Sequence, residues 1–121
     1  MKKIILLFVF SFMTWMNLDA QVYAVAASKA EYATQKSVGV ITFRFGSDVL
    51  PETILTTGEN FTEYFTTSFD AATYVGTFTM KENAEMNRLM LGRFLIGCGV
   101  EVVEFDGLQL PVYQFSNEQL K

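Results

Sequence analysis

Apolar and polar residues alternate with a period of two in several short segments, which is typical of strands with one buried face. The clearest segment is 38–45, which is rich in β-branched and aromatic side chains. Its alternation places Ile41, Phe43 and Phe45 on one face. We therefore predict a strand at 38–45 that packs this face into the core.

Two hairpins follow from the same reasoning. Residues 61–69 and 73–80 are rich in threonine and aromatic side chains and flank a bend at 70–72. Residues 101–105 and 108–115 are separated by Asp106-Gly107, and Asp-Gly between two apolar runs is a strong hairpin signal. These patterns predict four further strands.

Helical spacing is strongest at 83–97, where apolar residues recur at steps of three and four. Those residues are Met86, Leu89, Met90, Phe94 and Leu95. Asn83 is a candidate cap, with a Thr79–Glu82 capping box as the alternative. Gly92 falls in a polar stripe along the helix. Because this stripe is narrow, we expect other parts of the protein to cover most of the helix surface. A shorter helix is expected near Pro51, with Ser47 or Asp48 as its cap.

The element order is strand, helix, strand, strand, helix, strand and one added strand. This order predicts an α+β fold, a ferredoxin-like βαββαβ two-layer sandwich with an extra C-terminal edge strand. The domain is expected to span 37–116, with Pro111 placing the last strand at an edge. Residues 21–36 are interpreted as a leader or a short frayed helix, and 117–121 as a polar tail.

The first twenty residues have the layout of a secretory signal peptide. Lys2 and Lys3 precede an uncharged apolar run of about 10 residues, too short for a membrane-spanning helix. Ala20 is the expected cleavage position, with Ala24 or Ala26 as alternatives, and an uncleaved anchor remains the other interpretation. Cleavage after Ala20 predicts a periplasmic or secreted protein with no stable membrane anchor.

Charge excludes some classes of partner. The chain has 9 basic and 13 acidic residues. Without Lys2, Lys3 and Asp19, 7 basic and 12 acidic residues remain, for a net charge of −5. Such a surface argues against binding to nucleic acid or anionic lipid.

Cys98 is the only cysteine, and the chain has no histidine. A zinc or copper site therefore lacks a ligand set, and we expect no metal and no cofactor. Cys98 is expected to be a small buried residue at a helix end, with an intermolecular disulfide as the alternative.

In its layout, the chain resembles the heavy-metal-associated domains. The resemblance covers 38–107 and rests on the strand 38–45 and on the helix that closes with Gly97-Cys98-Gly99-Val100 before 101–103. It implies a ferredoxin-like fold. The metal-binding cysteines of that family follow the first strand, whereas the loop at 46–51 has no thiol, so a metal-carrier role is not implied.

Aromatic side chains are concentrated on the hairpin at 61–80. If some of them lie on an exposed sheet face, they form a patch suited to a partner or a sugar. The candidate binding residues are Tyr64, Phe69, Tyr74 and Phe78. The expected function is thus an exported, non-catalytic binding or interaction module of the cell envelope. It would act through this face or through the edge strand 108–115, on a protein partner or as a homodimer.

The alternative function is a small hydrolase or transferase. It would use the carboxylates of Asp48, Glu52 or Glu59 with an arginine such as Arg44. Without histidine, the chain lacks the side chain that ordinarily titrates near neutral pH. The enzyme hypothesis therefore requires Arg44, Asp48 and a third polar group to meet in one pocket.

Overall fold

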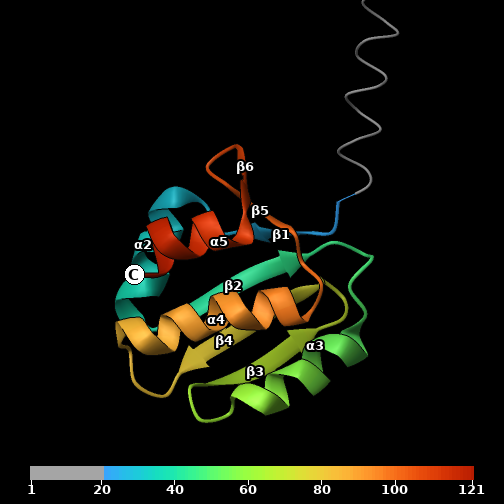
Figure 1. Ribbon diagram of the computed structural model, residues 1–121, viewed down its shortest axis with the longest axis horizontal. Helices are drawn as coiled ribbons and strands as arrows, with labels where there is room; N and C mark the ends of the chain where they lie inside the picture. The colour runs from blue at the N-terminus through green and yellow to red at the C-terminus, as the bar shows by residue number, and fades with distance from the viewer. Residues whose placement is uncertain (1–20) are drawn as a thin grey trace, which may run out of the picture.

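A computed structural model describes residues 21–121, which form a six-stranded sheet in the order β3-β4-β2-β1-β5-β6 (Figure 1). Strands β1 and β5 are parallel, and all other neighbouring pairs are antiparallel. The strands are β1 (Tyr23–Ala26), β2 (Val40–Phe45), β3 (Phe65–Asp70), β4 (Val75–Met80), β5 (Val102–Phe105) and β6 (Leu108–Pro111). The expected signal peptide lies outside the described residues.

The helices α3, α4 and α5 lie in front of the sheet in Figure 1, and α2 lies at one end of it. Their bounds are α2 (Lys29–Val38), α3 (Pro51–Gly58), α4 (Glu85–Gly97) and α5 (Val112–Phe115). A 3-10 turn, η1 (Glu59–Phe61), follows α3, and a π-helical turn, η2 (Ser116–Leu120), continues α5. The mixed α+β class predicted from the sequence is confirmed.

The core between the layers is built largely from phenylalanine. Ile41, Phe43 and Phe45 on β2 are each at most 1% exposed, as their alternation predicts. The ring of Phe78 on β4 lies 4.9 Å from that of Phe94 on α4 and 5.7 Å from that of Phe65 on β3. These contacts join α4 to β4, and β4 to β3, within one core.

Residues 21–36 are part of the domain, so their interpretation as a leader or frayed helix is wrong. β1 pairs with β2 on one side and β5 on the other, in the interior of the sheet. Ala24 is fully buried and Ala26 is 8% exposed. Alanine has low strand propensity, so this segment lacks the signal that marks the other strands.

α2 is also well anchored, although it has no sustained apolar face. Its single buried residue, Tyr32, packs edge to face against Phe105 and Phe115, with ring centroids 5.3 and 5.7 Å away. The Ser28 hydroxyl accepts a hydrogen bond from the Glu31 N–H at the start of α2. Gly39 ends the helix with a φ of 79°, so β2 begins at Val40.

The position of β1 also changes the strand order. In the predicted sandwich, the strand at 101–105 would lie beside the strand at 38–45. In the structure β1 separates β5 from β2. The part from β2 to β4 keeps the expected arrangement, with β2 and β3 running parallel on either side of β4.

The last part of the chain differs most from the prediction. Asp106 and Gly107 have φ values of 53° and 78° and form the predicted hairpin, and β6 is an edge strand. However, β6 ends at Pro111 and the chain then becomes helical. Phe115 and Leu120 are fully buried, so 116–121 is not a frayed tail. Proline lacks a donor for the ladder, and its fixed φ suits the residue before a helix.

The predicted caps of α4 and α3 are wrong. α4 follows Ala84 and α3 follows Leu50, and neither of these residues makes a side-chain capping bond. The Asn83 side-chain amide instead donates to the main-chain oxygens of Lys36 and Ser37, at 2.9 and 3.1 Å. Asn83 thereby satisfies carbonyl groups that the end of α2 leaves without partners.

The burial of Leu120 predicts its contribution to stability. We expect Leu120→Ala to lower the free energy of unfolding by about 2–5 kcal/mol, because it leaves a cavity beneath η2. Urea denaturation followed by circular dichroism measures this loss. Tyr113→Ala, at a side chain 73% exposed, is the control and is expected to change stability by less than about 0.5 kcal/mol. Equal stability of the two variants would mean that Leu120 and η2 are not packed against the core.

Candidate binding groove

The four aromatic residues expected to form a binding surface do not lie together on an exposed face. Phe78 is fully buried in the core. Phe69 and Tyr74 pack against each other with centroids 5.0 Å apart, and the Tyr74 hydroxyl donates to the Val49 main-chain oxygen at 2.8 Å. Tyr64 precedes β3 and is half-buried against the core. These four rings pack in or against the core, on the face of the sheet that the helices cover.

The opposite face of this hairpin carries hydroxyl groups. Thr66 pairs with Thr79, and Ser68 pairs with Thr77, across β3 and β4. These residues alternate with Phe65 and Phe78, so they point away from the helices. Small hydroxyl side chains on an antiparallel sheet are a normal water-facing surface, and they suggest no particular ligand.

The residues of the enzyme hypothesis are not gathered in one pocket. Arg44 and Asp48 are both exposed. Arg44 projects from the hydroxyl face of the sheet, whereas Asp48 lies in the turn before α3. Neither residue lines either of the two hollows described below.

Cys98 lies at the end of α4 and is 8% exposed, as expected for a small buried residue. Burial raises the pKa of the Cys98 thiol to about 11, and a hydrogen bond with the Thr57 side chain opposes this effect only in part. Within residues 21–121, no group of three acidic or thiol side chains is placed to hold a metal ion. A thiol that remains protonated is a poor nucleophile and a poor metal ligand.

The raised pKa predicts slow thiol chemistry. At pH 8 we expect Cys98 in the folded protein to react with a disulfide reagent such as dithionitrobenzoate roughly 100-fold more slowly than in urea, because burial suppresses the thiolate and blocks access. Absorbance of the released chromophore measures both rates. A native rate equal to the unfolded rate, or a disulfide-linked dimer on a non-reducing gel, would contradict the buried position.

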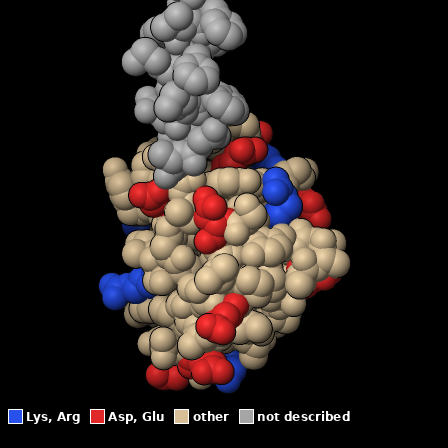
Figure 2. All heavy atoms as spheres, turned by 90° about the vertical axis from the view of Figure 1, so that its right-hand side faces the viewer, with Lys and Arg blue, Asp and Glu red and all other residues tan. Residues whose placement is uncertain are grey.

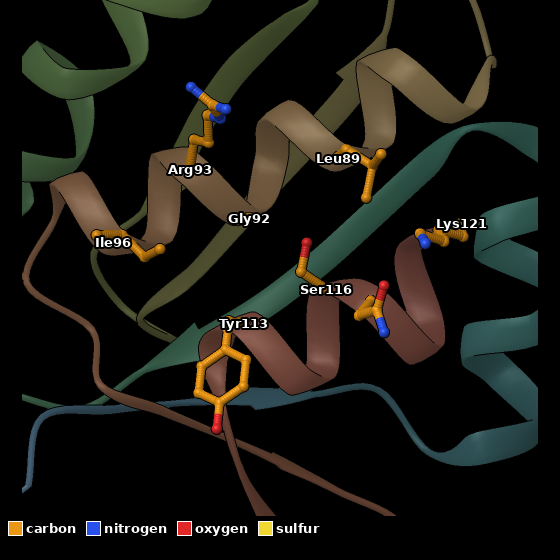
Figure 3. A pocket seen from close by; sticks show the side chains of 8 residues that line it. Leu89, Gly92, Arg93, Ile96, Tyr113, Ser116 and Lys121 are labelled. Atoms are coloured by element: carbon orange, nitrogen blue, oxygen red, sulfur yellow. The ribbon is translucent and has the colours of Figure 1, made fainter.

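A hollow with a largely apolar wall lies between α4 and the C-terminal helical segment α5–η2 (Figure 3). It has a volume of about 330 Å³. Its lining residues are Leu89, Gly92, Arg93, Ile96, Tyr113, Ser116, Asn117 and Lys121. We call this hollow the α4 groove.

A close helix crossing forms the floor of the α4 groove. Gly92 faces Ser116, and a Cβ atom at position 92 would collide with the Ser116 hydroxyl. Glycine in a helix interior is unfavourable by about 1 kcal/mol relative to alanine. At position 92 this cost is offset because glycine lets α4 and η2 approach each other closely. This explains why Gly92, expected in a polar stripe, is buried.

The two walls are also tied together at one end of the groove. The Arg88 Nε donates to the main-chain oxygen of Leu120 at 2.9 Å, and its Nη2 donates to that of Lys121 at 3.1 Å. A third Arg88 nitrogen, Nη1, donates to Asn83 Oδ1 at 2.9 Å. Arg88 thus holds η2 against α4, and the segments run antiparallel with Lys121 near the start of α4.

Apolar side chains remain open to solvent at the other end. Ile96 is 57% exposed and Tyr113 is 73% exposed. Both line the groove, from α4 and α5 respectively (Figure 3). The pattern at 108–115 predicts a strand, so this pair was not expected. Only the helical path after Pro111 places Tyr113 at the same hollow as Ile96.

The charge of the groove differs from that of the whole protein. Two of its eight lining residues are basic, Arg93 and Lys121, and none is acidic. Acidic side chains lie at several separate places on the side of the molecule shown in Figure 2. The groove is therefore a locally cationic, largely apolar site on an acidic protein.

A second hollow of about 320 Å³ lies between α3 and β3. Leu55, Gly58, Glu59, Thr62 and Thr67 line it. The Thr67 hydroxyl is buried there without a hydrogen-bond partner among the described residues. It fits tightly beneath Gly58, so this atom marks close packing rather than a space for a ligand.

No protein-family model matches the chain, and neither the curated proteins nor the solved structures include a significant match. In the part that the structure describes, none of the helices has the length and apolar character needed to cross a bilayer.

Proposed function

We propose that this protein is an exported, non-catalytic binding module of the cell envelope, and that the α4 groove is its binding surface. The partner is a protein. This surface replaces the aromatic hairpin, whose central ring, Phe78, is buried.

The observation that carries the proposal is the exposure of Ile96 and Tyr113 at one end of a concave site. Exposed apolar residues are common when they occur singly, as do Leu50 and Leu108 here, each 60% exposed. Two of them at one hollow, one of which is a tyrosine, have the composition of a recognition site. Binding there would remove both side chains from water.

The contacts of the first described residues support the proposed cleavage position. The Val22 N–H donates to Glu101 Oε1 at 3.0 Å, and the Val22 main-chain oxygen accepts from the Glu101 N–H at 2.8 Å. Cleavage after Ala20 would leave Gln21, which is exposed, outside these contacts. Cleavage after Ala24 or Ala26 would remove residues of β1 from the interior of the sheet. We therefore propose cleavage after Ala20 and a periplasmic or secreted protein.

We also propose that the likeness to the heavy-metal-associated domains is one of layout and is limited to β2, α3, β3 and β4. The parallel placement of β2 and β3 around β4 supports this limited likeness. The loop at 46–50 contains no cysteine, so metal transport is not part of the proposed function.

The proposed processing predicts a defined amino terminus. When the full chain is expressed with its first twenty residues in a bacterial secretion host, the exported protein is expected to begin at Gln21. Intact mass spectrometry and amino-terminal sequencing measure this position. Ala20→Arg is the control, because signal peptidase requires a small residue before the cut, and it should leave the precursor uncleaved. A product that begins at Val25 or Ala27, or an uncleaved wild-type chain, would contradict the proposal.

The proposed binding surface predicts which substitutions abolish capture of a partner. Immobilised protein is expected to retain a specific envelope protein from its source, and Ile96→Ala with Tyr113→Ala should lower the retained amount at least fivefold, since each removes an exposed apolar contact. Quantitative mass spectrometry measures retention. Leu50→Ala and Leu108→Ala are matched controls of equal exposure away from the groove. Retention that survives the groove substitutions and is lost in a control would place the binding surface elsewhere.

A further inference from the structure

We infer that the α4 groove binds a short peptide segment of its partner that has an apolar half and an acidic half. This inference rests on the proposed function and deepens it. It assigns the apolar half to the end of the groove at Ile96 and Tyr113, and the acidic half to the end at Lys121.

The antiparallel course of the two walls gives the groove its polarity. Gly92 faces Ser116, and Arg88 contacts the main chain at Leu120 and Lys121. Moving along α4 away from Arg88 therefore corresponds to moving back along η2 and α5 toward Tyr113. Ile96 and Tyr113 consequently share one end, and Leu89 and Lys121 share the other, as Figure 3 shows.

The charges favour carboxylates over other polar groups. Arg93 and Lys121 are exposed cations, and the groove has no acidic side chain that would neutralise them locally. The nearby Arg88 is already engaged, because its guanidinium donates to oxygens of Leu120, Lys121 and Asn83. A carboxylate bound at the Lys121 end gains a charge-assisted contact with the Lys121 side chain. Arg93, on the rim of the groove, adds a longer-range attraction.

The length of the groove limits the length of the segment. Ile96 follows Leu89 by seven positions on α4. At about 1.5 Å per helical residue, they span about 10 Å. An extended peptide rises about 3.3 Å per residue, so three or four residues fill the groove. Such a small site gives weak affinity by itself, and the rest of the partner adds further contacts.

The experiment titrates the isotope-labelled protein, residues 21–121, with blocked tetrapeptides while amide chemical shifts are recorded. The peptides are acetyl-Phe-Leu-Glu-Glu-amide and its counterparts with Gln-Gln or Lys-Lys at the last two positions. The acidic peptide should shift the amide signals of Leu89, Ile96, Tyr113 and Lys121. Its dissociation constant should be about fivefold lower than that of the glutamine peptide, because exposed charge pairs are individually weak. The lysine peptide should bind more weakly than both.

Charge variants separate attraction to the cations from simple apolar contact. Arg93→Gln and Lys121→Gln should bring the affinity for the acidic peptide to that for the glutamine peptide, and should leave the latter unchanged. Lys81→Gln, at an exposed lysine that does not line the groove, is the matched control. Because the substituted side chains are exposed, the amide spectra of the variants should match that of the wild type, which verifies their folding.

Several results would overturn the inference. Equal affinity for the acidic and glutamine peptides removes the preference for carboxylates but leaves the groove as a binding surface. Shifts confined to the hydroxyl face, or no shifts with any peptide, remove the groove as a peptide site, and the capture experiment then decides the proposed function separately. Tighter binding of dodecanoate than of the acidic peptide assigns the groove to an amphiphile. Concentration-dependent dimerisation that protects Ile96 assigns it to a second copy of this chain.

Discussion

The pairing of β1 with both β2 and β5 joins the structure into one sheet. On one side of β1 lie β2, β4 and β3, and on the other lie β5 and β6. Without β1, no strand pairing within residues 21–121 connects these two parts. Ala24 and Ala26 face the helical layer there, and their small side chains leave room for the large rings of Phe43 and Phe45 on the next strand. The position of β5, and of everything after it, depends on this strand.

The α4 groove depends on how the C-terminal segment is held. Phe115 enters the core against Phe43 and Phe105, each with centroids 5.8 Å away. The Tyr32 hydroxyl donates to the main-chain oxygen of Gln119 at 3.0 Å. Together with the Arg88 contacts, these interactions fix α5–η2 at a short distance from α4. The site is therefore a consequence of core packing, and its exposed residues can vary without loss of the fold.

The prediction from sequence succeeded where the chain carries a regular apolar pattern. The alternation at 40–45 and the helical spacing at 85–97 are strong because many large side chains repeat at one period. It failed at 21–36, where alanine gives little strand signal, and at 112–120, where a short apolar run fits either a strand or a helix. The binding residues were missed for the same reason, since Tyr113 meets Ile96 only if 112–115 is helical.

By itself, the sequence determined the α+β class, both hairpins, the buried face of β2, the long helix and the acidic character of the protein. These features follow from local propensity and from the periodic burial of side chains, which adjacent residues specify together. Only the tertiary structure decided the interior position of β1, the course of the chain after Pro111 and the groove at Gly92. Each of these depends on contacts between residues far apart in the chain, such as Val22 with Glu101 and Tyr32 with Gln119. No local pattern encodes which distant surface a short segment will meet.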